Sequence, residues 1–580
     1  MNTHFKKLIL AYKPCSTTWS PLLPFCFLAN YLIDNFAFNA FNSAEVNVYA
    51  ALEDKIPGRL LPGLPFAKPC FPPVDEAACA LVRQHYLDGT TRYDKPASAV
   101  NVQWETCQRT QEQCLLNWMN VSDITATSSP FTCKQGSVSP AYIDVRTPED
   151  VMHAFNHSKT TGTHLVIHNT GHDYIGRSFA PNSLGLWIHN LKNITLHRNF
   201  VPSDCDVKPA SAVTMGAGVQ WGEAYAFAEA NNITIVGGSD KGVGSVGGWL
   251  QGGGHSMLSN TLGLGVDRVI EFKVVTPDGH FRIANKCQNP DLFFALRGGG
   301  GGTFGVVLEA TVLASPQLTL QALRITWSQP DFNLTSDLWK LMIDNAEILA
   351  RKGFGVTGVA TLTTFASPAV TSGEAEKLLA PLIDFGNKIV AEGVPGAQVI
   401  FNEYSSFYPY YQEHIAPIGV PNGIPIAVAS RLVPHDNFAT SQSKSDLHAA
   451  MLDIFPNFFI LGTSPVNFKH DEGTSVTEAW RKTVWHVLNS KLWNYDTTLE
   501  EKKAIYSQVS KSVDKLRAIT PPAAYGNEAD VYEPDHEVAF WGSHYPDLLR
   551  IKKKYDPDHL LDCWHCVGWN PHSARYSCYV

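Results

Sequence analysis

The stretch from residue 237 to residue 256, GGSDKGVGSVGGWLQGGGHS, limits what this chain can fold into more than any other feature. Nine of its twenty residues are glycine. Glycine at this density costs a helix or strand about 0.5–1 kcal/mol per site. In return, it lets bare backbone N–H groups approach a bulky anionic group closely. Because Val, Trp and Leu are interspersed, the stretch predicts a backbone cradle rather than a flexible linker.

Two further loops share this character. One is LRGGGGGTFGVV at 296–307, and the other is IHNTGHDYIGRS at 167–178, which sets His172 between Gly171 and Asp173. The apolar run at 164–169, which leads into the loop with His172, predicts a buried strand. The two glycine-rich loops at 237–256 and 296–307 lack the GKS or GKT of a Walker A motif and a clean GxGxxG at a first strand.

Strand and helix patterns divide the rest of the chain into two parts with different secondary-structure order. Residues 141–145 read as a strand, a helix follows with Thr147 as its N-cap, and 164–169 read as the next strand, which indicates an α/β unit. After about residue 318 the patterns predict strands at 318–327, 355–365 and 397–404, with helices at 333–352, 373–391 and 499–519. The expected fold class is therefore α+β, with an antiparallel sheet backed by helices in the second part.

Length and composition narrow the class of protein. The chain has 580 residues, 44% apolar and 17% charged, which is ample for more than one core. A net charge of -9 argues against nucleic acid or an anionic membrane as partner. The apolar run 21–33 predicts a signal peptide, and it is too short and broken to span a membrane.

Cysteines cluster at the two ends of the chain. Cys563 and Cys566 have the spacing of half a zinc site, but no second pair accompanies them, so we expect no metal. Disulfides that hold the terminal segments fit an oxidising compartment, and hence secretion; scattered reduced thiols are the alternative. Five Asn-x-Ser/Thr sequons are about what chance gives, so they add little.

Five motifs in order carry a resemblance to a known family. They are NTGHDYIGRS, VGGSDKGVGSVGGWLQGGGHS, LGLGVDRVIEFKVVTPDG, PDLFFALRGGGGGTFGVV and the terminal FWGSHYPDLLRIKKKYDP. Together they resemble the berberine-bridge-enzyme-like FAD-linked oxidases of the vanillyl-alcohol-oxidase superfamily, and most of all their fungal members. The resemblance covers about residues 66–580.

The resemblance implies a domain plan and a cofactor. It implies a leader over 1–65, a two-subdomain PCMH-type FAD domain over 66–318, a substrate domain over 319–525 and a returning C-terminal segment over 526–580. It also implies FAD bonded through its 8α-methyl group to His172. Many members have a second tether to a cysteine, whose position here is Asp240, so a single tether is expected. The expected cofactor-binding residues are Thr170, Gly171, His172, Asp173, Tyr174, Ser178, Gly238, Ser239, Asp240, Gly242, Val243, Gly244, Gly248, Gly253, Val307 and His544.

The catalytic base is less constrained by the pattern. The stretch 402–414 offers Tyr404, Tyr408 and Tyr410, and a tyrosine beside a flavin can act as a base, although sheet tyrosines usually pack in the core. His255 lies near the end of the glycine-rich stretch 237–256, and it can lie near the flavin ring or cap a helix. His544 stands where the family usually has Asn, which leaves its flavin contact open.

The implied activity is hydride transfer from a small alcohol, amine, sugar or secondary-metabolite intermediate to flavin N5, with O2 as the final acceptor and hydrogen peroxide as product. Two branches compete. A secreted carbohydrate or alcohol oxidase predicts a wide polar cleft, and an intracellular tailoring enzyme predicts a closed aromatic one. A dehydrogenase with another acceptor and a non-catalytic flavin-binding protein are the rivals outside these branches. The sequence does not predict an oligomeric state.

Overall fold

The structure is a computed structural model that describes residues 46–469 and 473–580. Residues 55–580 form one compact unit, and residues 1–54 form another, in which helix α2 (Val46–Glu53) is described. The run 21–33 that predicts a signal peptide lies outside the described residues.

The first sheet of the compact unit carries the loop with His172. Its strand order is β1 (Leu60–Pro62), β2 (Ala141–Asp144), β4 (Ser183–Trp187) and β3 (His164–His168). Strands β2, β4 and β3 are parallel, and helix α5 (Pro148–Thr161) joins β2 to β3. Thr147 and Asp150 form a capping box at the start of α5, as the sequence predicts for an N-cap there. Strand β1 lies in the segment expected to be irregular, so that expectation is wrong for residues 60–62.

The second sheet is antiparallel and supports the other two glycine-rich loops. Its order is β5 (Ile194–Phe200), β6 (Ala210–Gly216), β10 (Val306–Leu313), β8 (Val269–Val275) and β9 (Phe281–Ala284). The helices around it are α6 (Trp221–Ala230), α7 (Gly248–Gln251), α8 (Ser259–Leu262), α9 (Gly265–Arg268) and α10 (Pro290–Leu296), and a short pair joins β7 (Ile233–Thr234) to β11 (Ser315–Pro316).

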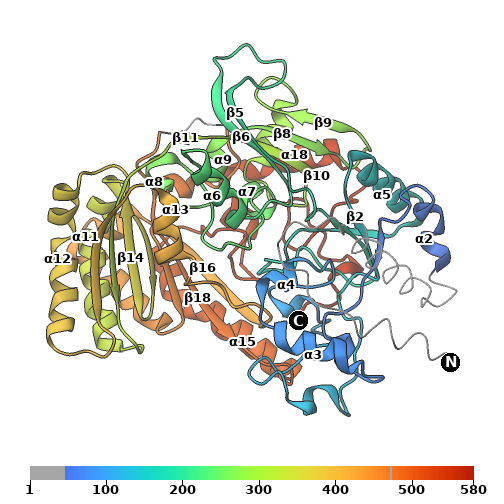
Figure 1. Cartoon of the computed structure of the whole chain (residues 1–580), viewed down its shortest axis with the longest axis horizontal. Helices are drawn as coiled ribbons and strands as arrows, with labels where there is room; N and C mark the ends of the chain where they lie inside the picture. The colour runs from blue at the N-terminus through green and yellow to red at the C-terminus, as the bar shows by residue number, and fades with distance from the viewer. Residues whose placement is uncertain (1–45, 470–472) are drawn as a thin grey trace, which may run out of the picture. The chain divides into compact units, whose positions relative to one another are not determined.

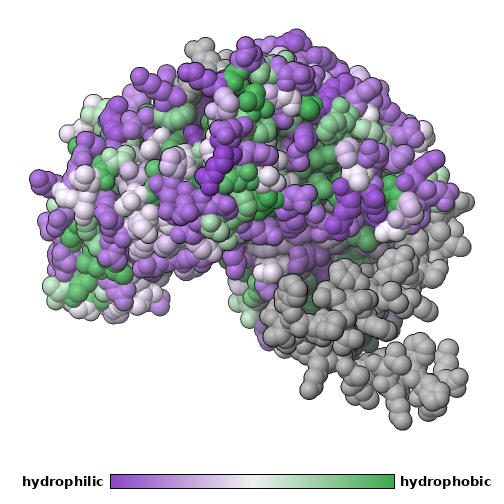
Figure 2. Space-filling view, turned by 45° about the horizontal axis from the view of Figure 1, so that its top comes forward, coloured by the Kyte–Doolittle hydropathy of each residue, from purple (hydrophilic) through white to green (hydrophobic). Residues whose placement is uncertain are grey.

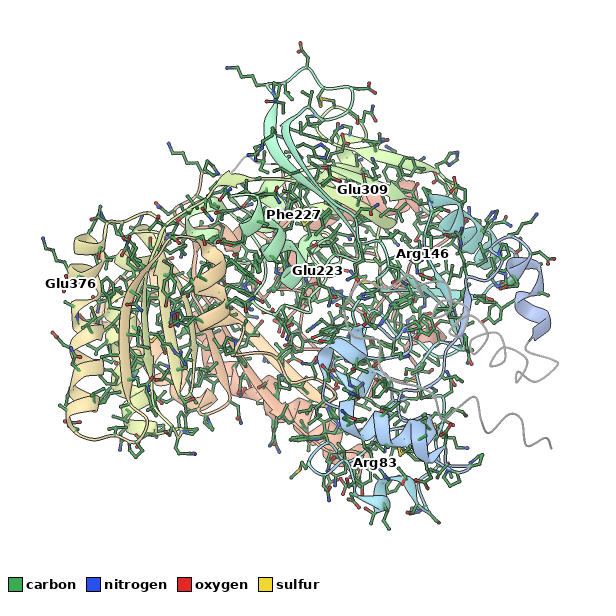
Figure 3. All side chains as sticks on the ribbon, in the orientation of Figure 1. Arg83, Arg146, Glu223, Phe227, Glu309 and Glu376 are labelled. Carbon is green, nitrogen blue, oxygen red and sulfur yellow. A yellow bond between two sulfur atoms is a disulfide. The ribbon has the colours of Figure 1, made fainter. Side chains whose placement is uncertain are left out.

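The third sheet has seven antiparallel strands. Their order is β15 (Gln398–Tyr404), β12 (Leu320–Thr326), β14 (Leu362–Ser367), β13 (Gly355–Val359), β17 (Phe458–Leu461), β18 (Thr483–Leu492) and β16 (Ile426–Pro434). Helices α11 (Phe332–Arg351) and α12 (Ser372–Ala391) lie side by side along its outer face, and Glu376 on α12 points away from it (Figures 1 and 3). The α+β class and the helix-backed antiparallel sheet predicted from the sequence are confirmed.

Alternation along strand β16 gives this sheet two different faces. Ala427 and Ala429 belong to the core cluster that contains residues of α11 and α12, such as Met342 and Leu379. The residues between them must point the other way, since successive side chains of a strand alternate. The second face is therefore free to line a cavity.

The remaining helices are α3 (Glu76–His85), α4 (Gly89–Tyr93), α13 (Phe407–Tyr410), α14 (Ser441–Met451), α15 (Leu499–Ser512), α16 (Asp514–Ile519), α17 (His536–Trp541) and α18 (Tyr545–Tyr555). Helix α14 packs against α11, and α15 packs against β16.

The C-terminal tail returns to the first sheet. Arg575 donates a hydrogen bond to the carbonyl of Leu165 on β3 at 2.8 Å, and the Tyr579 hydroxyl donates to the carbonyl of Gly176 at 2.8 Å. A disulfide joins Cys107 to Cys578. The tail thus holds both the strand before His172 and the loop after it.

All ten cysteines among the described residues form disulfides, as the end-clustering predicts. The pairs are Cys70–Cys79, Cys107–Cys578, Cys114–Cys133, Cys205–Cys287 and Cys563–Cys566. Cys563 and Cys566, which have the spacing of half a zinc site, are therefore joined to each other by a disulfide.

Within the described ranges, no helix is long and apolar enough to cross a bilayer. The face shown in Figure 2 is mainly hydrophilic, with apolar side chains scattered over it.

Candidate functional site

A cavity of about 960 Å³ lies where the glycine-rich loops meet the seven-stranded sheet. One wall comes from the loops after β3, before α7 and before β10. The opposite wall comes from the turn between β13 and β14 and from strands β16, β17 and β18, and residues 525–528 close one side. This volume suits a cofactor ring together with a small ligand.

His172 is held in this cavity by a tight loop. Gly171 before it has φ +82°, and a side chain at Gly171 would meet the carbonyl oxygen of Ser98 at 2.8 Å. The Asp173 carboxylate closes the loop by accepting backbone N–H groups of Gly176 (2.8 Å) and Ser178 (2.7 Å). The positive φ and the close contact with Ser98 therefore require glycine at position 171. Asp173 fixes the conformation of the loop that carries the His172 imidazole.

The imidazole of His172 has a buried nitrogen that makes no hydrogen bond. Its Nε2 atom is buried, has no hydrogen-bond partner, and lies 3.6 Å from Oδ1 of Asp240. The ring of Tyr93 packs against it with centroids 5.2 Å apart. Burial lowers the pKa of His172, and the Asp240 carboxylate opposes that shift. An imidazole nitrogen that is buried at a cavity without a partner can act as a nucleophile.

Asp240 is itself held in place. Its carboxylate accepts the backbone N–H of Gly242 at 2.7 Å and that of Val420 at 3.2 Å. The second contact comes from the loop before β16, which also lines the cavity. Asp240 therefore links the glycine-rich loop to the opposite wall of the cavity and presents its charge to His172.

Two glycines on the cavity wall leave room for a close neighbour. A Cβ added at Gly248 would meet nothing within 4 Å, and one at Gly302 would have its nearest contact, Ile167, at 3.8 Å. Both residues line the cavity. Side chains at these positions would project into it, so the backbone there forms an open cradle.

Fourteen of the residues predicted for the site line this cavity. They are Thr170, Gly171, His172, Asp173, Tyr174, Ser178, Gly238, Ser239, Asp240, Val243, Gly244, Gly248, His255 and Val307. They come from three loops far apart in the sequence, which the two small sheets bring together.

Three predicted cofactor residues do not line it. Gly242 belongs to the Asp240 turn and packs on Tyr93, and Gly253 packs on Val476. The Nδ1 atom of His544 lies 3.0 Å from the carbonyl oxygen of Val476. These residues contact neighbouring loops and are not among those that line the cavity, so their assignment stays a prediction.

The tyrosines predicted as bases also lie elsewhere. Tyr404 ends β15 and donates to Glu413 at 2.9 Å, while the buried Tyr410 pairs with Thr364 at 3.2 Å. Neither these two nor Tyr408 is among the residues that line the cavity. Burial raises the pKa of Tyr404 to about 12, which further disfavours a phenolate. These tyrosines therefore lie outside the cavity wall, and the buried Tyr404 and Tyr410 have hydrogen-bond partners elsewhere.

His255 does line the cavity, and it belongs to a cluster that the sequence does not indicate. Its Nε2 atom lies 3.3 Å from both carboxylate oxygens of Glu528, and His486 Nε2 lies 2.8 Å from Oε2 of the same carboxylate. The Nδ1 atom of His255 is 3.0 Å from the hydroxyl of Thr463. Tyr525 packs edge-on against both imidazoles.

The charge on this cluster follows from its contacts. Burial alone would raise the pKa of Glu528, but the attraction of His255 and the hydrogen bonds from both imidazoles lower it. Burial lowers the pKa of His486, against the opposing effect of Glu528. The cluster thus presents an ionised carboxylate flanked by imidazoles at one side of the cavity.

Sequence reasoning missed several residues of the cavity wall. Arg177, Trp249, Tyr525, Asn527 and Glu528 all line it. Arg177 lies within the motif NTGHDYIGRS and Trp249 within VGGSDKGVGSVGGWLQGGGHS, so the sequence motifs could have identified both residues. Glu528 carries no local signal, because its partners lie in distant segments.

Comparison with known proteins agrees with this geometry. Residues 139–285 match the family model described as FAD binding domain, and residues 524–563 match that described as berberine and berberine like. The chain is 35% identical to the FAD-linked oxidoreductase ffsJ of Aspergillus flavipes, over 91% of this chain and 93% of the relative. It is 36% identical to the FAD-linked oxidoreductase cheF of Chaetomium globosum, over 90% and 86% of the two chains.

A solved structure shows the same architecture. The VAO-type flavoprotein MtVAO615 of Myceliophthora thermophila C1 superposes with a TM-score of 0.79 at 27% identity, over 91% of this chain and 96% of that chain. The fold, the loops around the cavity and these relatives agree. The chain belongs to the FAD-linked oxidoreductases of the vanillyl-alcohol-oxidase and berberine-bridge-enzyme family.

Proposed function

We propose that this enzyme is an O2-using oxidase that holds FAD by one covalent bond to His172 and oxidises an apolar small molecule bearing a hydroxyl group. The observation that carries the proposal is the Nε2 atom of His172, which is buried at the cavity without a hydrogen-bond partner. Buried polar atoms are almost always paired, so an unpaired one at a cavity points to a missing partner.

The cavity fits the cofactor on several grounds. Gly248 and Gly302 leave backbone exposed where a side chain would intrude. His172 offers an imidazole nitrogen, and Thr170, Ser239 and Val243 place backbone groups along the same wall. These residues would hold FAD, with the imidazole as the bonding group and the glycine-rich backbone against its polar parts.

A single bond to the protein is consistent with the residue at position 240. Asp240 has no thiol, so it does not form the thioether that a cysteine forms in many relatives. A bond between the His172 imidazole and the 8α-methyl group of FAD would release one hydrogen from each, and O2 would take up both as hydrogen peroxide. The Asp240 carboxylate 3.6 Å away can attract the imidazole proton during this step.

The reaction divides between cofactor and protein. Bound FAD supplies the electron sink, accepting a hydride equivalent from the substrate and losing its electrons to O2. The walls of the cavity orient the substrate and exclude water. Of the predicted catalytic residues, His255 is the one placed to contact a substrate there.

The substrate-side wall favours an apolar ligand. Strand β16 contributes Ile426 and Val428, and strands β17 and β18 contribute Phe458, Leu461 and Leu488. Polar side chains on this wall include Asn457, Ser490 and Lys491, but a sugar hydroxyl that faces the aliphatic side chains would lose water without replacement. The wall therefore supports the branch of tailoring enzymes over carbohydrate oxidases, with aliphatic more than aromatic contacts.

The compartment is a separate part of the proposal. Five disulfides among the described residues support passage through the secretory pathway, because cytosolic thiols are kept reduced. An intracellular tailoring enzyme would have to keep these pairs oxidised in a membrane-enclosed compartment.

The test begins with the cofactor. The purified protein and a His172→Ala variant are run on a denaturing gel and imaged for flavin fluorescence, with His448→Ala as a control on helix α14. We expect fluorescence in the wild type and the control and none in His172→Ala. Aliphatic secondary alcohols and oligosaccharides are then compared by hydrogen peroxide release. A wild-type protein without covalent flavin would contradict the tether. Flavin that is reduced by substrate but not reoxidised by air would contradict oxidase activity.

A further inference from the structure

The cluster of His255, His486 and Glu528 brings three strong metal ligands to one point. The nitrogen and oxygen atoms that could ligate an ion lie within 4.8 Å of one another. They come from the segment after the glycine-rich loop, from strand β18 and from the C-terminal segment. The expectation of no metal rests on sequence spacing, which does not register such a convergence.

We propose that His255, His486 and Glu528 form a binding site for a divalent first-row transition metal, with an open position toward the cavity. Two imidazole nitrogens and one carboxylate oxygen are a donor set found in catalytic zinc sites, where a fourth position stays free. His255 and Glu528 line the cavity, whereas His486 is fully buried behind them.

The distances in the cluster suit an ion at its centre. Ligand atoms around a tetrahedral zinc, each about 2.0–2.1 Å from it, are roughly 3.3 Å apart. The Nε2 atom of His255 is 3.3 Å from Glu528, and that of His486 is 2.8 Å from Glu528. The separation of the two imidazoles, at most 4.8 Å, must shorten somewhat, and Glu528 has room to adjust because its side chain is 22% exposed.

The surroundings supply the support that a metal-bound histidine needs. A histidine that ligates through Nε2 carries its proton on Nδ1 and donates it to a fixed acceptor. His255 Nδ1 lies 3.0 Å from the Thr463 hydroxyl, which can accept that proton. Trp480 and Tyr525 pack against the imidazoles and limit the ways in which they can turn.

The charge balance defines what the ion would bind. Two neutral imidazoles and one carboxylate carry a single negative charge, so a divalent ion leaves the site with a net positive charge. Its open position would therefore take an oxygen donor from the ligand in the cavity, such as a hydroxyl group, and polarise it. Metal binding does not depend on FAD, but this role in oxidation rests on the proposed function.

The test uses the full-length protein as purified and zinc as the probe. Metal content is measured by inductively coupled plasma mass spectrometry after dialysis, and zinc affinity by titration calorimetry on protein stripped with a chelator. We expect one metal ion per chain and a dissociation constant for zinc below about 1 μM. His486→Gln and Glu528→Gln should weaken zinc binding at least about 100-fold, and Thr463→Val about 10–100-fold. His448→Gln, outside the cavity, should bind zinc as the wild type does.

The outcomes distinguish failure of the metal-site proposal from failure of the proposed flavin-dependent function. Thr463→Val is the mildest change and keeps the test valid if a ligand variant does not fold. A wild type that retains flavin but binds no stoichiometric metal, or variants that bind zinc as tightly as wild type, would overturn the metal site alone. Zinc binding by a protein without flavin would contradict the proposed function and leave the metal site standing.

Discussion

The Oδ1 atom of Asp240 lies 3.6 Å from the Nε2 atom of His172, although the two residues belong to different glycine-containing loops. The Asp240 side chain is a carboxylate fixed by two backbone N–H groups. It is therefore a charged neighbour of the imidazole.

Asp240→Asn should slow attachment of flavin to His172. The amide keeps the size of the side chain but cannot attract the imidazole proton, so we expect attachment to be slower by about 100-fold. The measure is the ratio of gel-bound flavin fluorescence to total flavin absorbance. Asp206→Asn, an exposed change in the loop after β5, serves as control. Equal ratios in both variants would remove Asp240 from the attachment step.

His168→Phe should make the protein more tolerant of acid. His168 is fully buried at the end of β3, neither ring nitrogen has a hydrogen-bond partner, and its ring centroid lies 5.0 Å from that of Phe179. Burial lowers the pKa of His168 from 6.5 to about 3. Between these values the unfolded chain binds a proton that the folded chain does not, so stability falls as pH falls.

The size of this effect follows from the same linkage. The contribution of His168 is fully present above pH 6.5 and declines below it by roughly 1.4 kcal/mol per pH unit. Urea unfolding of the wild type and His168→Phe at about pH 7 and about pH 5 measures the difference. Parallel pH dependences of the two free energies of unfolding would show that His168 titrates normally.

Removal of the Cys107–Cys578 disulfide should loosen the cofactor loop. This disulfide anchors the tail whose Tyr579 hydroxyl donates to the carbonyl of Gly176, in the loop that carries His172. The double variant Cys107→Ser/Cys578→Ser should lose about 2–5 kcal/mol of unfolding free energy. It should also retain less covalent flavin.

A second disulfide separates these two effects. The Cys205–Cys287 pair lies beside the second sheet, away from the tail. Its double serine variant should lose stability but keep its covalent flavin, measured by thermal unfolding and in-gel fluorescence. Equal flavin loss in both double variants would mean that general destabilisation, and not the tail, controls the loop.

Ala360→Trp should narrow the substrate side of the cavity. Ala360 lies in the turn between β13 and β14, lines the cavity and is partly exposed, so a larger side chain there can extend into the cavity, although Ala360 also packs against the core cluster. We expect kcat/KM for bulky alcohols to fall at least about tenfold. Flavin content and the rate of air reoxidation should not change. Ala230→Trp, exposed at the end of α6, is the control, and equal kinetics in the two variants would place the substrate elsewhere.

The local parts of the site could be predicted from short stretches of the sequence. A buried strand followed by a glycine and a histidine, and glycine runs too dense for a helix, are properties of short segments. Their structure depends on backbone freedom and side-chain periodicity. For this reason the loops around His172, Gly238 and Val307 could be assigned before the fold was known, as could the class of antiparallel sheet backed by helices.

Which distant residues share the cavity depends on how the strands and loops pack in three dimensions. Tyr404 lies on β15, and the strand order puts β15 at the edge of the sheet opposite β16, away from the strands that line the cavity. A sequence pattern identifies a strand but carries no information on its place in the sheet. The same holds for His255, His486 and Glu528, since packing among three segments sets their 2.8–3.3 Å contacts. No spacing rule within one segment can encode a meeting of that kind.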